Sequence, residues 1–189
     1  MNYSEYREIT EHYPNTEGLS YDLALLWLHP ERLPVELVSL NGCTERVIRI
    51  PQSVRNKYGR EVAVVRISPC AFRSNTNVTD VMIPPGVTKI ERETFSGCTS
   101  LKRIALPKSV RSIGVAAFAD CASLEDIYYE GTADEWGAIR IKSEKRVRVF
   151  GELIGGTPVQ EIIDDRLVRI RGNEALYTAT IHFCCETRK

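Results

Sequence analysis

Two consecutive stretches of 23 residues share one pattern of apolar residues, and this repeat constrains the fold more than any other feature of the chain. The first copy starts at Val78 and reads VTDVMIPPGVTKIERETFSGCTS, and the second starts at Leu101 and reads LKRIALPKSVRSIGVAAFADCAS. Both follow the template L-x-x-I-x-L-P-x-x-V-x-x-I-x-x-x-A-F-x-x-C-x-x. A period of roughly 20 to 30 residues with spaced aliphatic residues indicates a solenoid, in which successive turns of the chain stack on one another.

The template also predicts the local structure of each turn. Ile104 and Leu106 alternate as in a β-strand, and Pro107 ends that strand because proline cannot donate the next ladder hydrogen bond. The V-x-x-I spacing that follows indicates a bend or a second short strand. The GVAAF segment, residues 114–118, predicts a tight helical turn that delivers its phenylalanine into the core.

Incomplete copies flank the two regular ones. Residues 47–54 supply the strand half of a copy and residues 64–75 supply its V-x-x-I and Ala-Phe half, so residues 55–63 between them predict a loop with a turn at Gly59. Another copy begins at Leu124 and then departs from the template. One copy buries too little apolar surface to offset its backbone entropy, so stacked neighbours and end caps must stabilise it.

The rest of the chain is expected to cap this single solenoid domain. Residues 1–17 form a polar leader or short helix, and residues 18–45 form a β-rich N-terminal cap with strands in Leu19–Leu28 and Pro34–Leu40. Such strands would cover an edge that is otherwise free to pair with another chain. Residues 46–141 hold the repeats, and residues 142–189 hold a diverged repeat and a C-terminal cap with a closing strand.

Several motifs together resemble one known family, the bacterial BspA-like leucine-rich repeats. They are IP-x-x-V, V-x-x-I-x-x-x-A-F, F-x-x-C-x-x-L, the segment IYYEGTADEWGAI, and the later segment GNEALYTATIHF, residues 172–183. The resemblance implies an α/β repeat that folds as a right-handed leucine-rich-repeat solenoid, with mostly short β-strands and short helical turns. Many members of the family are exported, so it also implies a cell-surface or secreted protein.

Composition excludes several classes of partner. Lys plus Arg and Asp plus Glu each number 25, so no charge excess points to nucleic acid. The longest apolar run, LALLWL, is far shorter than the roughly 20 residues that span a bilayer, so no membrane insertion is expected. The N-terminus lacks the apolar region of a secretion signal, so the sequence as it stands favours the cytoplasm.

Cysteine and histidine residues offer an alternative to a pure scaffold. Cys98 and Cys121 are one period apart, where they form either a buried ladder of small side chains or a disulfide. A metal site is the alternative for three residues near the C-terminus, but zinc sites usually combine two ligand clusters, so a polar edge of the cap is favoured. These residues are His182, Cys184 and Cys185.

No catalytic motif is present, so the chain is not expected to be an enzyme, and no cofactor or metal is expected. Thr132 and Glu135 form a capping-box pattern that starts a short helix. Trp136 in that helix packs on the last turn as a lid, or stacks on a ligand in the alternative interpretation.

The outward positions of the strands carry the functional hypothesis. One row carries opposite charges on neighbouring strands, which should attract and hold the register. A second row has aromatic, apolar and Arg side chains, and Tyr and Arg are enriched in interface hot spots. We therefore expect an exposed ladder face that binds a protein partner of unknown identity; a structural or self-associating module is the alternative. The candidate residues are Arg49, Asp80, Met82, Arg103, Ala105, Asp126 and Tyr128.

Overall fold

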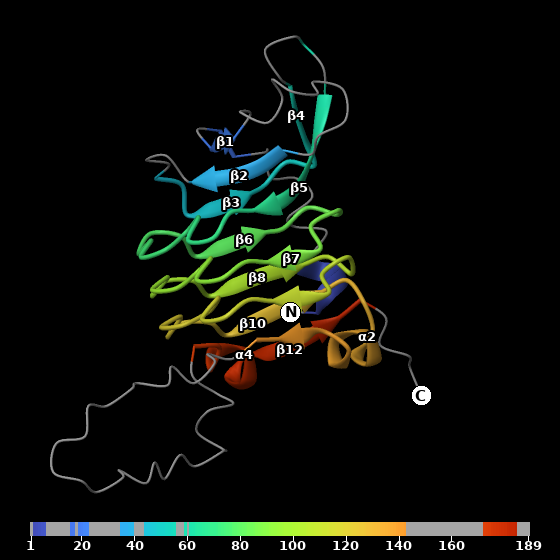
Figure 1. The fold of residues 1–189 in the computed structure, drawn as a ribbon. Helices are drawn as coiled ribbons and strands as arrows, with labels where there is room; N and C mark the ends of the chain where they lie inside the picture. The colour runs from blue at the N-terminus through green and yellow to red at the C-terminus, as the bar shows by residue number, and fades with distance from the viewer. Residues whose placement is uncertain are drawn as a thin grey trace, which may run out of the picture.

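Successive turns of the repeat stack one above another in the computed structural model of the chain (Figure 1). Among the residues that the structure describes, none of the helices is long and apolar enough to cross a bilayer. The described residues are 2–6, 16–17, 19–22, 35–39, 44–55, 59, 61–142 and 172–184.

A five-stranded parallel sheet runs along one side of the stack. Its strands, in spatial order, are β12 (Thr180–Phe183), β10 (Asp126–Tyr129), β8 (Arg103–Leu106), β6 (Asp80–Met82) and β3 (Val47–Arg49). The predicted register is confirmed, because Ile104 lies opposite Val81 on one side and Ile127 on the other. Each of these three side chains is fully buried, so the alternate residues on each strand face outward.

The V-x-x-I half of each turn forms a second, shorter sheet. Its strands are β11 (Arg140–Ile141), β9 (Ser112–Ile113) and β7 (Lys89–Ile90), all parallel. The second short strand expected from the spacing is therefore present. Ile90 and Ile113 are fully buried, and the core lies between this sheet and the five-stranded sheet.

Phenylalanine and cysteine ladders fill the side of the core opposite the strands. The rings of Phe72, Phe95 and Phe118 stack in sequence, with centroids 4.9 Å and 5.2 Å apart. Cys98 and Cys121 are buried free thiols, and each donates a hydrogen bond to a carbonyl of the preceding turn, at 3.0 Å and 3.1 Å. The buried ladder is thus the arrangement found, without a disulfide.

The segment before each of these phenylalanines is not helical, so that prediction is wrong. Residues 115–120 are turns, and Ala116 has a φ of 52°. Positive φ values recur at 23-residue intervals, at Cys70, Glu93 and Ala116 and again at Ser74, Gly97 and Asp120. These left-handed residues bend the chain sharply, which lets each turn return at the height of one strand spacing, about 4.8 Å.

Four strands form the N-terminal end of the stack. They are β1 (Ser20–Asp22), β2 (Val35–Ser39), β5 (Glu61–Ile67) and β4 (Ser53–Arg55), in that spatial order. Strands fall inside both expected segments, and β2 pairs with β5. Strand pairing extends into the segment predicted as a loop, because Arg55 lies opposite Glu61 and Ser53 opposite Ala63, while Gly59 has the φ of 75° that suits its predicted turn.

The C-terminal cap closes the other end of the sheet. Helix α4 (Ala175–Thr178) precedes β12, which adds the last parallel strand beside β10, as the closing-strand prediction requires. Buried Asn173 supplies a side chain in place of a further turn. Phe95 N–H donates to the carbonyl of Ala117 in the following turn. The equivalent group one turn later, Phe118 N–H, donates instead to Asn173 Oδ1 at 3.0 Å.

Helix α2 (Ala133–Gly137) starts where the capping box predicts. Glu135 N–H donates to Thr132 Oγ1 at 3.3 Å, and Thr132 N–H donates to Glu135 Oε2 at 2.9 Å. Trp136 is partly buried against the core and meets the edge of Tyr129, so it packs on the last turn as expected of a lid. The diverged repeat predicted between residues 142 and 171 lies almost wholly outside the described residues.

Candidate functional site

Sheet register brings the predicted residues into two rows on the outer side of β3, β6, β8, β10 and β12. We call this surface the ladder face. The first row is Val47, Asp80, Arg103, Asp126 and Thr180, and the second is Arg49, Met82, Ala105, Tyr128 and His182. All seven candidate residues therefore lie together on one surface, at about 4.8 Å per strand step.

Charged residues of the first row pair along the sheet. Arg103 Nε donates to Asp80 Oδ1 at 2.5 Å, and Thr79 Oγ1 donates to Asp80 Oδ2 at 2.7 Å. This hydrogen bond is the main reason why the pKa of Arg103 is raised. Asp126 Oδ1 lies 2.7 Å from His182 Nε2. The expected attraction between neighbouring strands is thus present between Asp80 on β6 and Arg103 on β8, while the contact of Asp126 with His182 of the second row links β10 to β12.

The second row holds a stack of three rings that extends beyond the sheet. Tyr128 lies between two partners: the ring of His182 at 4.7 Å with 14° between planes, and the ring of Tyr6 at 3.8 Å with 2° between planes. His182 belongs to the strand on one side of Tyr128. Tyr6 therefore occupies the other side, above the small side chain of Ala105 on β8.

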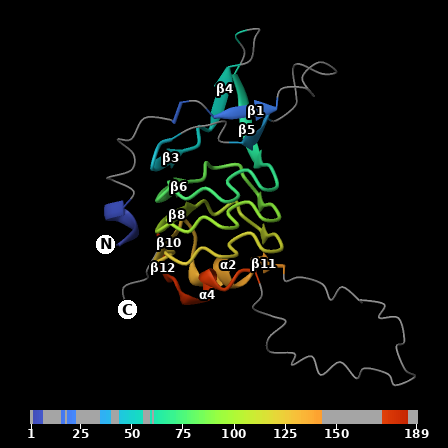
Figure 2. The same ribbon diagram turned by 90° about the vertical axis from the view of Figure 1, so that its left-hand side faces the viewer.

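An N-terminal helical turn delivers Tyr6 to this position. Residues 3–6 are helical, and Figure 2 shows the turn beside β6, β8 and β10. A reciprocal capping box starts it: Glu5 N–H donates to Asn2 Oδ1 at 2.8 Å, and Asn2 N–H donates to Glu5 Oε2 at 3.1 Å. Tyr3 and Tyr6 are three residues apart, so both lie on the helix side that meets the sheet.

This turn corrects the expectation that the whole ladder face is exposed. Tyr128 is 0% exposed, Asp80 4% and Met82 8%, and Tyr6 itself is 3% exposed. The polar leader predicted for residues 1–17 thus contributes to the site. Composition indicated only that this segment is polar. Its role could have been predicted from two other signals, the N-x-x-E capping pattern and the three-residue spacing of Tyr3 and Tyr6.

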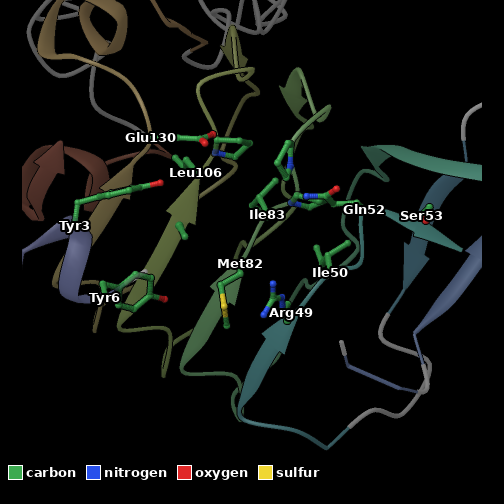
Figure 3. A pocket seen from close by; sticks show the side chains of 14 residues that line it. Tyr3, Tyr6, Arg49, Ile50, Gln52, Ser53, Met82, Ile83, Leu106 and Glu130 are labelled. Carbon is green, nitrogen blue, oxygen red and sulfur yellow. The ribbon is translucent and has the colours of Figure 1, made fainter. Parts of the chain in front are cut away.

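A pocket of about 420 Å³ opens beside the turn, at the end of the ladder face where the strands finish (Figure 3). Tyr3 and Tyr6 form one wall, and Met82 and Ala105 of the second row contribute another. Arg49 and Glu130 also line it, so the pocket has a mixed polar and apolar lining that includes one cationic and one anionic residue.

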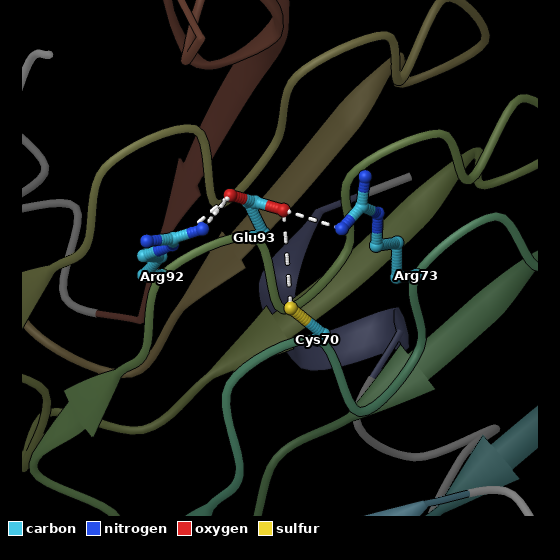
Figure 4. Close-up of polar contacts among 4 residues, drawn as sticks. All are labelled: Cys70, Arg73, Arg92 and Glu93. Atoms are coloured by element: carbon cyan, nitrogen blue, oxygen red, sulfur yellow. Dashed lines mark hydrogen bonds and ion pairs between the residues drawn. The ribbon is translucent and has the colours of Figure 1, made fainter.

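A polar cluster of Cys70, Arg73, Arg92 and Glu93 lies on a different part of the turns (Figure 4). Glu93 accepts from Arg73 at 2.9 Å and from Arg92 at 2.6 Å, and the Cys70 thiol lies 3.9 Å from its carboxylate. The cluster joins adjacent turns at their positive-φ residues and is best explained as structural.

Metal-ligating side chains do not gather within the described part of the chain. No group of three His, Cys, Asp or Glu residues there has the arrangement of a metal site. His182 bonds to Asp126 instead, while Cys185 lies outside the described residues. The metal interpretation of the C-terminal strand therefore gains no support from this geometry.

Comparison with known proteins bears on the fold. The family described as "BspA type Leucine rich repeat region (6 copies)" matches residues 62–139. A leucine-rich repeat protein of T. pallidum (TpLRR) is similar at 25% identity and a TM-score of 0.51, over 64% of this chain and 56% of that protein. The chain thus spans little more than half the length of TpLRR.

A second solved structure, a leucine-rich repeat protein from Bacteroides capillosus, is 28% identical with a TM-score of 0.49, over 58% of this chain and 76% of that one. A search of curated proteins found no significant match. The repeats predicted from the 23-residue period are therefore confirmed over residues 62–139 of this α/β solenoid, the segment that matches the BspA-type leucine-rich repeat family.

Proposed function

We propose that the chain is a non-enzymatic scaffold that binds a protein partner through its ladder face. Leucine-rich repeat proteins generally mediate interactions between proteins, and stacked repeats offer an extended, rigid surface for them. The observation that carries the proposal is the second row beside its pocket: cationic, apolar and aromatic side chains in fixed register on one sheet.

Rigidity is the physical advantage of this arrangement. Each outward side chain stands on a strand whose backbone is bonded on both sides, except at the sheet edges. The Asp80–Arg103 and Asp126–His182 pairs fix neighbouring strands, so little ordering entropy remains to be lost on binding. Catalysis has no corresponding basis here, since the polar residues of the face pair with one another for register.

A pair of charge-reversal variants tests the proposal. Arg49 lines the pocket, while Arg140 is an exposed residue of β11 in the second sheet. The immobilised wild-type protein, Arg49→Glu and Arg140→Glu are each incubated with lysate of the source cells, and bound proteins are quantified by mass spectrometry. Proteins lost from Arg49→Glu but retained by Arg140→Glu are the expected result. Equal capture by both variants would contradict binding at the ladder face.

A further inference from the structure

The N-terminal turn occupies the ladder face as a bound peptide would. A single helical turn is too short to be stable in water without other contacts. The capping box between Asn2 and Glu5 is exposed to solvent, and Tyr6 N–H donates to Asn2 O at 3.1 Å within the turn. Docking of Tyr6 on Tyr128, with the Tyr6 side chain almost fully buried, therefore holds the turn in place.

Ala105 creates the space that Tyr6 fills. Its neighbours in the second row are the much larger Met82 on β6 and Tyr128 on β10. A small residue between two large ones leaves a slot whose one wall is the flat face of an aromatic ring. Parallel stacking on that wall, with 2° between the ring planes, suits another aromatic side chain.

Charged side chains of both signs surround Tyr128: Asp126, Asp80 and Glu5 are anionic, and Arg103 is cationic. Arg103 lies close enough to Tyr6 to interact electrostatically with its hydroxyl group. Glu5 belongs to the same turn, and its carboxylate is among the charges near Tyr128, whose pKa is raised chiefly by burial. The parallel ring stack, and not the surrounding charge, is therefore what matches the slot to a tyrosine side chain.

The turn leaves part of the site unfilled. The pocket of about 420 Å³ continues from Tyr6 along Met82 toward Arg49, and residues 2–6 form one of its walls. A segment that filled both the slot and the pocket would bury more surface than the turn does. We propose that the ladder face is a docking site for a tyrosine-bearing peptide segment of the protein partner, and that residues 2–6 are its internal competitor.

This inference rests on the proposed function and names the chemistry of the partner. The turn is tethered to the site, so it competes at an effective concentration of roughly millimolar. Removing its ring should therefore expose a site for free peptide. Two variants of the full chain separate the contributions: Tyr6→Ala empties the slot, and Ala105→Leu in the Tyr6→Ala background fills it again with a side chain from the sheet.

Met82 provides the signal, since the chain has only 2 methionines and Met82 lines the pocket with Tyr6. Protein carrying ¹³C-methyl methionine is titrated by NMR with the peptide MNYSEYREI, residues 1–9 of the chain, up to roughly millimolar concentration. In Tyr6→Ala, the peptide should move the Met82 signal toward its wild-type position at least about tenfold more readily than in the wild type. A peptide with alanine in place of the second tyrosine should have no such effect, and neither should the native peptide on the variant that also carries Ala105→Leu.

The inference would be overturned if adding the native peptide to Tyr6→Ala left the Met82 signal unchanged. Equal responses of this variant to the native and the alanine-substituted peptide would also overturn it. Light scattering gives a further test. If the wild-type protein were a dimer and the Tyr6→Ala variant a monomer, the occupant of the ladder face would be a second copy of this chain, and the inference would be wrong. The capture experiment with Arg49→Glu and Arg140→Glu does not depend on the peptide. Failure of the tyrosine preference is therefore distinguishable from failure of the proposed function.

Discussion

Gly114→Ala should destabilise the solenoid strongly, because the added methyl group has no room between two turns. An alanine Cβ at this position would lie 2.6 Å from both Arg92 N and the carbonyl carbon of Glu91, whereas ordinary contact begins near 3.4 Å. Both obstacles are backbone atoms of the preceding turn, so no side chain can move aside. The two turns must separate locally by roughly 0.8 Å.

The magnitude follows from what this separation strains. Overpacking in a tightly packed core costs typically about 1–3 kcal/mol. Gly114 N–H also donates to Ile90 O at 2.8 Å, and its carbonyl accepts from Asn173 Nδ2 at 3.1 Å. Stretching these two bonds adds roughly 1 kcal/mol. We expect a total loss near 3 kcal/mol of unfolding free energy, and a fall in Tm of about 10 °C for a chain of this size.

Gly137 is a matched control, since it lies one period later. It ends helix α2, and a Cβ there would meet nothing within 4 Å. Gly137→Ala should leave stability unchanged or raise it by up to about 1 kcal/mol, because alanine favours helix. Urea unfolding followed by circular dichroism measures both variants. A Gly114→Ala variant within about 1 kcal/mol of the control would refute the account of how the turns pack.

Three further predictions concern the cap, the cysteine ladder and the ladder-face ion pair. Asn173→Ala should cost about 2–3 kcal/mol in urea unfolding because it leaves two buried backbone groups and one partly buried group without their partner, whereas exposed Asn77→Ala should cost under about 0.5. Burial raises the pKa of the Cys98 and Cys121 thiols to about 12, above their unfolded value near 8.5, so stability is intact below about pH 8.5 and falls as pH rises toward 12. The loss at pH 10 should be about 2 kcal/mol per thiol, and a double alanine variant that is equally pH-sensitive would contradict this. Asp80→Asn should lower stability by about 1–2 kcal/mol at low salt; an unchanged urea midpoint would show that the pair to Arg103 contributes nothing.

The 23-residue period predicted the sheets well because the stacked core repeats the same contact in every turn. Ile104 must meet Val81 and Ile127 for the core to close, and this single requirement also places Met82, Ala105 and Tyr128 in one row. Core register and surface rows are therefore one prediction. The closing strand β12 was predicted instead from the resemblance of residues 172–183 to the closing segment of the family, and it pairs with β10 as expected.

Structural features that occur only once in the chain cannot be predicted from the 23-residue period. Docking of Tyr6 depends on a contact across more than a hundred residues, which no local pattern encodes. The side-chain amide of Asn173 accepts the hydrogen bond from Phe118 N–H that a carbonyl of a further turn would otherwise accept. This role is visible only in the structure. The hairpin of β4 and β5 interrupts a repeat, so its residues fit neither the template nor a loop.

Backbone conformation at the corners was also hidden from the pattern. Ala116 adopts a positive φ, which the side chain of alanine disfavours, so its type gives no signal there. Gly97 does give one, yet the residues one period away are Ser74 and Asp120. Turn geometry is imposed by the stacking of neighbouring turns, and local residue preference yields to it.

Hydroxyl-radical footprinting of the wild-type protein, with and without a captured partner, tests the central claim most directly. Tyr6 is 3% exposed and Met82 8% exposed in the free chain, while Tyr177 on helix α4 is 60% exposed and serves as an internal reference. Partner binding at the ladder face predicts more oxidation of Tyr6, less of Met82 and no change at Tyr177. Protection of Tyr177 with Tyr6 and Met82 unchanged would contradict it.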